Sequence, residues 1–267
     1  MRVVWFAIFV LACGHPPNEY MPKQAPRPRI VAHRGASFEA PENTIAAFKR
    51  AWTLGVEAVE LDVHVTADGE VVVIHDPTTK RVAGVDRKIA EHTLAELREL
   101  DVGAWKHVKY KGERIPTLAQ ALATIPAGRT MFVEIKSPKT TAPAIGKVIH
   151  DAHPTSVSIA LQGFDPDALA ALAAAVPDAP AYWTVDPPRD ANDQPLPYPL
   201  TLIDETKRHG FAGLALDYRG VTDELIAAAN KQEILLDVWT LNETALLADW
   251  GKRDVRWIET DRPELAP

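Results

Sequence analysis

The sequence predicts an α/β fold, a (β/α)8 (TIM) barrel with an insertion after the second strand. Short β-branched runs alternate with helical periodicity along the chain, as in a parallel sheet with crossover helices. About 240 residues follow an atypical N-terminal segment, close to the ~250 residues typical of such barrels. A doubly wound open sheet is the competing fold, but the chain lacks the glycine-rich dinucleotide fingerprint that would support it.

The first 28 residues predict an export signal and a tether outside the fold. The apolar run 3–12 has the length of a signal-peptide core and is too short to cross a bilayer. Val-Leu-Ala-Cys at 10–13 resembles a bacterial lipobox, so Cys13 is the expected site of lipidation; the alternative is a secretory signal with an incidental cysteine. Residues 14–29 are rich in proline, a composition that indicates an exposed tether. We therefore expect an exported bacterial protein, periplasmic or in the cell envelope, anchored to the membrane through Cys13.

The folded domain is expected over residues 29–267, where apolar runs and helical patterns alternate. Strands are predicted over residues 30–32, 58–63, 131–135, 157–161, 181–185, 213–216, 235–239 and 255–258. Helices are predicted over residues 42–53, 117–123, 142–151, 165–175, 200–208, 222–230 and 243–250. Pro41 would open the first helix, and Asp165 and Thr222 have the side chains of helix caps.

Two connections depart from the alternation of short strands and helices. The segment 76–116, between the second and third predicted strands, contains only one short helical piece, at 94–100. Long excursions at the carboxyl ends of strands usually form part of a binding site. The segment 186–199 is rich in prolines and acids and predicts an irregular loop for which the sequence offers no role.

Composition limits the partners. A formal charge of -7, with the acids spread along the chain, does not favour nucleic acid as a ligand. The single cysteine excludes an intramolecular disulfide and a cysteine metal cluster. A phosphate ligand would therefore need a local cationic pocket.

Carboxylates at strand positions predict a cation site. Glu60 and Asp62 are two residues apart, so in a strand they point to the same face, and Glu134 ends the next predicted strand. Three such acids would repel one another unless they held a hard divalent cation. Lys136 shares the face of Glu134, and His64 shares that of Glu60, either as a further ligand or as an ordinary polar residue.

Histidines and an arginine also end apolar runs. His33 and Arg34 follow the first run, and His75 and Asp76 follow the run 71–74. Because barrel closure gathers the carboxyl ends of all strands at one mouth, these groups and the carboxylates are expected to meet there. Such a set suits acid–base and metal-assisted chemistry on an anion.

The ordered motifs resemble the glycerophosphodiester phosphodiesterase family over about residues 30–263. In chain order they are HRG at 33–35, PENT at 41–44, ELD at 60–62, TADG at 66–69, HD at 75–76, IPTL at 115–118, EIK at 134–136, FDP at 164–166, WTLN at 239–242 and ETDRP at 259–263. Two departures lie near the mouth: Gln162-Gly163 stands where many relatives have serines, and Arg262 replaces a residue that is often aromatic.

The resemblance implies hydrolysis of glycerophosphodiesters to an alcohol and sn-glycerol 3-phosphate by a phosphoric diester hydrolase. It implies one divalent cation, Ca²⁺ or Mg²⁺, and the following roles. The acid–base pair is His33 and His75; the cation ligands are Glu60, Asp62 and Glu134; the phosphate contacts are Arg34 and Lys136; and the glycerol side is lined by Trp239 and Phe164.

Alternatives remain open for two residues and for the function. Glu42 either supports the site, as Asp76 is expected to do, or is an acid favoured by the N-terminus of a helix. Trp239 either lines the substrate or only fills the core. The same chemistry could act on lysophospholipids, in the manner of a lysophospholipase D. The third alternative is a lipid-anchored protein that binds a phosphodiester without catalysis.

Overall fold

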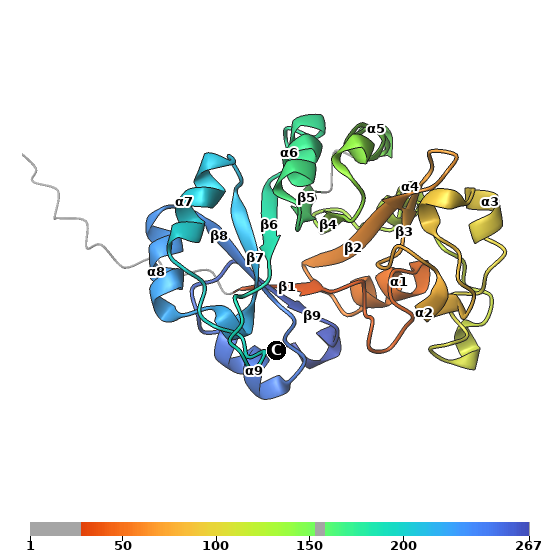
Figure 1. The fold of residues 1–267 in the computed structure, drawn as a ribbon. Helices are drawn as coiled ribbons and strands as arrows, with labels where there is room; N and C mark the ends of the chain where they lie inside the picture. The colour runs from red at the N-terminus through yellow and green to blue at the C-terminus, as the bar shows by residue number, and fades with distance from the viewer. Residues whose placement is uncertain (1–27, 153–157, 267) are drawn as a thin grey trace, which may run out of the picture.

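The structure, a computed structural model, describes residues 28–152 and 158–266. Eight parallel strands close into a barrel, because β1 pairs with β9 on one side and with β2 on the other (Figure 1). The predicted (β/α)8 fold is therefore confirmed. The barrel strands are β1 (Arg29–Ala32), β2 (Ala58–Val65), β4 (Thr130–Ile135), β5 (Ser158–Gly163), β6 (Ala181–Val185), β7 (Gly213–Asp217), β8 (Leu235–Trp239) and β9 (Trp257–Thr260).

One further strand lies outside the barrel. β3 (Val71–Val73) folds back antiparallel to the end of β2, with Val63 opposite Val73. The turn between them contains Gly69 at φ +84°, a conformation that favours glycine. This hairpin opens the insertion, and it turns the chain so that His75 returns toward the mouth of the barrel.

The helices surround the barrel. They are α1 (Ile45–Thr53), α4 (Leu118–Leu122), α5 (Ala142–Ala152), α6 (Pro166–Ala175), α7 (Thr201–Arg208), α8 (Asp223–Lys231) and α9 (Thr244–Trp250). The insertion adds α2 (Lys80–Ala83), η1 (Ile89–Glu91), α3 (Leu94–Leu97) and η2 (Val108–Tyr110). The remaining short helices are η3 (Lys139–Thr141), η4 (Tyr218–Gly220) and η5 (Pro263–Leu265). None of the helices in the described ranges is long and apolar enough to cross a membrane.

Helix caps decide several boundaries. Asp165 and Thr222 cap α6 and α8, as predicted. The predicted start of the first helix at residue 42 is wrong, since Thr44 is the N-cap and Asn43 has φ +57°. The last strand begins later than predicted, at Trp257, and extends to Thr260. Residue 157, the start of the fourth predicted strand (β5 in the structure), lies outside the described residues, as does Cys13.

The barrel interior has an apolar floor and a polar mouth. The floor is made of Val31, Ala58, Phe132, Ala160, Tyr182, Ala215 and Trp257. Phe132 packs centrally, with its ring centroid 5.4 Å from that of Tyr182 and 5.2 Å from that of Trp257. Since interior positions recur every two residues along a strand, the next interior residues toward the mouth include Glu60, Glu134 and Glu259. The floor excludes water beneath these carboxylates.

Candidate active site

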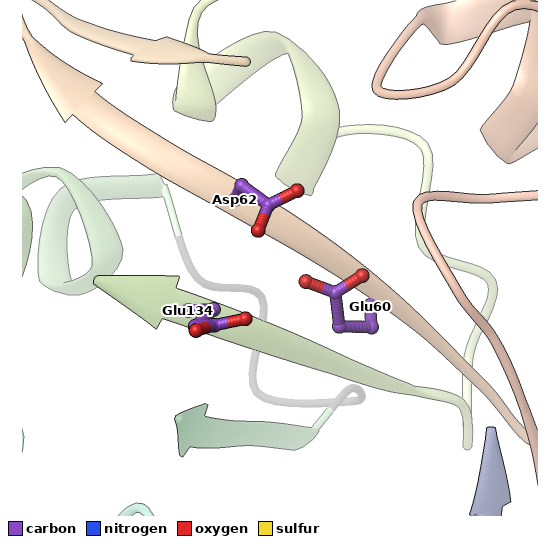
Figure 2. A group of neighbouring side chains, drawn as sticks. All are labelled: Glu60, Asp62 and Glu134. Atoms are coloured by element: carbon purple, nitrogen blue, oxygen red, sulfur yellow. The ribbon is translucent and has the colours of Figure 1, made fainter. Parts of the chain in front are cut away.

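Three acids from two neighbouring strands form the centre of the site. Glu60 and Asp62 of β2 and Glu134 of β4 each contribute a carboxylate oxygen to a group whose members all lie within 4.8 Å of one another. Figure 2 shows the three side chains converging between the two strands. The register explains this proximity, because Asp62 lies opposite Glu134 in the β2–β4 ladder. The three predicted carboxylates are thus brought together.

Their environment suits a cation. All three side chains are buried; Glu60 Oε1 has no hydrogen-bond partner, and Asp62 Oδ1 has none beyond its ion-pair contact with Lys136. Burial and the neighbouring acid charges raise the pKa of Glu60 well above its usual value, and burial raises that of Glu134. Buried oxygens without donors cost free energy unless a positive ion contacts them. The donor set, three carboxylates, fits Ca²⁺ or Mg²⁺.

Two cations of the protein flank the acids. Lys136 Nζ lies 2.7 Å from Glu134 Oε1 and 3.2 Å from Asp62 Oδ1. Arg34 donates its backbone N–H to Glu60 Oε2 at 2.8 Å, and its Nε lies 3.4 Å from Asp62 Oδ2. Burial raises the pKa of Asp62, but the charges of Lys136 and Arg34 outweigh burial and hold it well below its usual range. These two cations are placed to bind a phosphate beside the carboxylates.

His33 is held by a carboxylate at one ring nitrogen. Its Nδ1 lies 2.7 Å from Asp261 Oδ1, so Nδ1–H donates to Asp261 and Nε2 is the nitrogen left for the cavity. Asn242 Nδ2 donates to the other oxygen of Asp261 at 2.7 Å and fixes the acid in turn. Burial lowers the pKa of His33, but the hydrogen bond and the charge of Asp261 outweigh burial and leave it raised.

His75 is likewise paired with an acid at Nδ1, but its pKa is shifted in the opposite direction. Its Nδ1 lies 2.7 Å from Asp76 Oδ1. Asp76 also pairs with Arg81, and the pKa of this acid falls to about 2, chiefly through the Arg81 hydrogen bond. Burial and the charge of Arg34 lower the pKa of His75, and they outweigh its neighbouring acids. The pKa of His33 therefore lies above that of His75.

Glu42 lies outside the first helix and ties two arginines together. Its Oε1 accepts from Arg34 Nη1 at 2.9 Å, and its two oxygens accept from Arg81 at 2.7 and 2.9 Å. Glu42 lies two residues before the N-cap of α1, and its hydrogen bonds to both arginines favour the supporting role over that of an acid held only by the helix N-terminus. Glu42 therefore holds the Arg34 guanidinium in place.

His64 lies outside the group of three carboxylates. Its Nε2 donates to the backbone oxygen of His75 at 3.1 Å, and Ser137 Oγ lies 3.4 Å from its Nδ1. Both ring nitrogens therefore have protein partners. His64 supports the backbone that carries His75.

A cavity of about 250 Å³ unites the reactive groups. It is lined by His33, Arg34, His75, Glu134, Lys136, Gln162, Phe164, Thr184, Asp186, Trp239, Thr240 and Glu259. Trp239 Nε1 and Thr184 Oγ1 are buried without a hydrogen-bond partner. Such atoms suit the hydroxyl groups of a bound ligand, so the core-filling alternative for Trp239 is disfavoured. A larger cavity, about 630 Å³, opens at the amino ends of the strands and contains none of these reactive groups.

Several contacts that support the site were not predicted. Asn43 Nδ2 donates to Asp62 Oδ2 at 2.7 Å, and Asn43 Oδ1 accepts from the Asp62 N–H at 3.2 Å. Asp261, Asn242 and Arg81 hold the histidines and their acids. Asn43, Asn242 and Asp261 all stand inside motifs, so position within a motif was a usable signal. Nothing in the sequence marks Arg81.

A buried polar network lies beneath the cavity. Gln162 Nε2 donates to Asp237 Oδ2 and to Glu259 Oε1, each at 2.8 Å. Burial raises the pKa of Asp237 to about 7 and that of Glu259 well above its usual value. Gln162 thus binds two acids at once, a role that a shorter serine side chain at this position could not take in the same way.

A model of the glycerophosphoryl diester phosphodiesterase family matches residues 33–265, almost the whole described barrel. The chain belongs to this family. Among its relatives is a glycerophosphodiester phosphodiesterase of Bacillus subtilis strain 168, 27% identical over 254 residues, which are 88% of this chain and 84% of the relative. One from Caldanaerobacter subterraneus is 46% identical over 119 residues, but that match spans only 43% of this chain and 48% of the relative.

Solved structures of the family share the fold. An Oleispira antarctica phosphodiesterase, solved with the product sn-glycerol-3-phosphate, superposes with a TM-score of 0.81 at 27% identity, covering 89% of this chain and 94% of that one. A glycerophosphodiester phosphodiesterase of Thermotoga maritima gives 0.71 at 25% identity, covering 89% and 96%. Family membership makes the chain a phosphoric diester hydrolase, as the sequence predicts.

Proposed function

We propose that the protein hydrolyses glycerophosphodiesters to an alcohol and sn-glycerol 3-phosphate, using one divalent cation, Ca²⁺ or Mg²⁺, and the pair His33 and His75. One observation carries the proposal. Two histidines with opposite pKa shifts line the same 250 Å³ cavity as Arg34, Lys136 and Glu134, one of the three acids of the carboxylate centre. The family supports the substrate class, and the product in the Oleispira structure is consistent with it.

The two histidines divide the proton transfers. His75, whose pKa is lowered, is neutral near pH 7 and accepts the proton of a glycerol hydroxyl or a water through Nε2. The oxygen so activated attacks phosphorus, and the bond from phosphorus to the leaving alcohol breaks. Attack by water gives glycerol 3-phosphate directly, whereas attack by the glycerol hydroxyl gives a cyclic phosphate that a water molecule then opens to glycerol 3-phosphate. His33, whose pKa is raised, gives its Nε2 proton to the departing alkoxide. Asp76 and Asp261 keep both rings in the orientation that presents Nε2.

The phosphate is held by charge. Arg34 and Lys136 contact its oxygens and stabilise the negative charge that grows in the transition state. When bound at Glu60, Asp62 and Glu134, a divalent cation supplies further positive charge to the same oxygens. Trp239 and Thr184 offer unpaired hydrogen-bonding atoms to the glycerol hydroxyls.

The test is hydrolysis of glycerophosphocholine and glycerophosphoethanolamine by the purified protein, with Ca²⁺, with Mg²⁺ and with a chelator. We expect release of glycerol 3-phosphate that the chelator abolishes and added cation restores. His33→Ala should lose at least 10³-fold in kcat while the protein remains folded. An undiminished rate in chelator would refute the metal role, and an undiminished rate in His33→Ala would refute the acid–base assignment.

The lysophospholipid alternative has one supporting observation. Phe164, at the rim of the cavity beside Trp239, is 41% exposed and leaves an apolar exit for an acyl chain. Rates on lysophosphatidylcholine micelles and on glycerophosphocholine, measured with the same enzyme, separate the two substrate classes. Turnover of neither would favour the non-catalytic alternative, which the intact histidines and carboxylates oppose.

We also propose that Cys13 carries a lipid anchor on an exported protein. The support is the lipobox-like sequence at 10–13 and the proline-rich segment that follows. Arg29 begins β1, at the amino ends of the strands and opposite the mouth, so an anchor on that side would leave the mouth accessible. Incorporation of labelled fatty acid into the full chain, lost in Cys13→Ser, is the expected result. Equal labelling of both would refute acylation at Cys13.

A further inference from the structure

A second cavity adjoins the catalytic one. Its volume is about 360 Å³, and His33 and Arg34 line both cavities. The remaining walls come from the loop after β1, from the insertion and from the end of β9: Ser37, Phe38, Glu42, Trp105, Lys106 and Asp261. The two cavities thus meet at the groups that bind the phosphate and protonate the leaving oxygen. A phosphodiester held at Arg34 would direct one alcohol into each cavity.

The reacting groups decide which alcohol enters which cavity. His75 and Trp239, the proposed base and the glycerol wall, line only the first cavity, whereas His33 also borders the second. Since the proposed function gives His33 the proton for the leaving oxygen, the departing alcohol must lie on the side of the second cavity. Resting on that function, we propose that the second cavity is a leaving-group subsite that selects alcohols carrying negative charge.

The subsite is preformed by its own loop. Asp101 accepts three backbone N–H groups, from Gly103 and Ala104 at 2.9 Å and from Gly112 at 2.7 Å. A Cβ on Gly103 would lie 2.0 Å from the backbone oxygen of Tyr110, so the two sides of the loop are in direct contact. The loop is also tied to the barrel, because Tyr110 Oη donates to the backbone oxygen of Glu39 at 2.8 Å.

Two exposed aromatic rings form its walls. Phe38 is 52% and Trp105 44% exposed, although large apolar side chains are usually buried. Trp105 Nε1 donates to the backbone oxygen of Val102 at 2.8 Å, which fixes the indole. These rings present apolar surface to the carbon chain of an alcohol.

Lys106 gives the subsite a positive charge that is not paired with a carboxylate of the described residues. Lys106 Nζ lies 5.7 Å from the Trp105 ring centroid and 5.8 Å from that of Phe38, and no carboxylate of residues 28–152 or 158–266 pairs with it. The acids that line the cavity are already engaged, since Glu42 binds two arginines and Asp261 binds His33 and Asn242. Lys106 therefore contributes a charge that a ligand can balance.

The aromatic walls do not suit a quaternary ammonium group. Such a group needs a ring face, but Lys106 faces both rings and the Arg262 guanidinium lies 4.0 Å from the Phe38 centroid. A third cation there would be repelled. An alcohol that bears a carboxylate or a second phosphate would instead pair with Lys106.

The test compares three diesters that share the glycerophosphoryl group and whose leaving alcohols are cationic, neutral and anionic. They are glycerophosphocholine (cationic), glycerophosphoglycerol (neutral) and bis(glycerophospho)glycerol (anionic), each assayed for kcat/KM at low salt. The wild type should prefer the anionic diester, and Lys106→Met should lower its kcat/KM about three- to tenfold while leaving that of glycerophosphocholine unchanged or higher. Lys106→Glu should reverse the preference. High salt should weaken the wild-type preference.

Lys109→Met is the matched control. Lys109 is on the same loop, and its Nζ lies 4.7 Å from the ring centroid of Tyr110, but it does not line the cavity. This variant should therefore keep the wild-type ratios of kcat/KM among the three diesters. The proposed subsite would be refuted if the wild type preferred glycerophosphocholine. It would also be refuted if Lys106→Met kept the wild-type ratios of kcat/KM among the three diesters. Absence of activity on all three diesters would instead overturn the proposed function.

Discussion

At the scale of single residues, each histidine is paired with one acid, and those acids differ in their surroundings. Asp261 is fixed by Asn242 and has no arginine within ion-pairing distance in the described chain. Asp76 is shared with Arg81, which withdraws part of its charge from His75. Asp261 raises the pKa of His33, whereas burial and the charge of Arg34 lower that of His75 despite Asp76. The assignment of acid and base depends on this difference.

The pH profile of kcat/KM should be bell-shaped. The pKa of His75 is lowered, so the base is neutral above this value and activity falls as the pH drops through it. The pKa of His33 is raised, so the acid is protonated below this value and activity falls as the pH rises through it. The measurement is the initial rate across pH 4–10 at fixed cation concentration.

Two variants should move opposite limbs of that profile. Asp261→Asn removes the charge that raises the pKa of His33, so the alkaline limb should shift to lower pH by on the order of one unit. Asp76→Asn removes a group that raises the pKa of His75, so the acid limb should shift to lower pH. If both variants moved the same limb, or neither moved any, the assignment of roles would be wrong.

Glu60 should link cation binding to stability. A cation that binds only the folded protein stabilises it by about 2.7 kcal/mol at a concentration 100 times its Kd. Glu60→Gln removes one ligand charge and one source of repulsion among buried acids. This variant should unfold at the same or a higher temperature than wild type in chelator, and should gain little from Ca²⁺ or Mg²⁺.

Thermal unfolding with and without each cation provides the measurement. The exposed Glu70→Gln serves as the control and should respond to cation as the wild type does. If cation raised the unfolding temperature of Glu60→Gln as much as that of the wild type, Glu60 would be excluded as a ligand.

At the scale of elements, the turn between β1 and α1 carries several residues of the candidate site. It carries His33 and Arg34, then Glu42 and Asn43, which reach back to Arg34 and to Asp62 of β2. Arg34 and Asn43 both have positive φ, 56° and 57°. Non-glycine residues rarely adopt this conformation, and such strain is characteristic of functional sites. The turn therefore fixes both Arg34, the proposed phosphate contact, and Asn43, the partner of the proposed cation ligand Asp62.

Gly35 should tolerate no side chain in this turn. It has φ +80°, and a Cβ there would lie 2.7 Å from the Cβ and 2.8 Å from the backbone carbon of Ala47 in α1. Gly55 has a similar φ, +83°, with open space around it. Gly55→Ala should therefore cost about 1–2 kcal/mol from backbone strain alone.

Gly35→Ala adds a steric clash to the same strain and should cost more than about 3 kcal/mol. Urea unfolding of both variants gives the free energies of unfolding. Equal costs at the two positions would show that α1 can move away from β1 without penalty.

At the scale of the whole molecule, closure of the barrel makes the site. Glu60 and Glu134 are 74 positions apart, and His33 and Asp261 are 228 apart, yet each pair meets at the mouth. The apolar floor below them packs strands from both halves of the chain. Stability of the floor and geometry of the mouth are consequently coupled.

Phe132→Ala should destabilise the whole barrel. Phe132 is fully buried and packs against Tyr182 of β6 and Trp257 of β9. Loss of a buried phenylalanine costs about 3–5 kcal/mol. The expected result is a single cooperative unfolding transition at lower denaturant concentration. Val108→Ala, at a position 73% exposed, should unfold like the wild type; a similar shift in both would contradict the role of the floor.

The sequence by itself determined the fold class, the order of the barrel strands and helices, and the residues at strand ends, because hydrophobic periodicity and caps are local properties of the chain. It also predicted Glu60, Asp62 and Glu134 as a set, since the two-residue period of a strand fixes which side chains share a face. The start of α1 was wrong because a positive φ at Asn43 has no local sequence signal.

Only the tertiary structure decided which groups support the reactive ones. Arg81, Asn242 and Asp261 reach the histidines or their acids through contacts set by strand register and by the path of the insertion. The second cavity arises in the same way, between the loop after β1 and residues 101–112. Contacts between distant segments depend on how the barrel closes, and no periodicity in the chain records that closure.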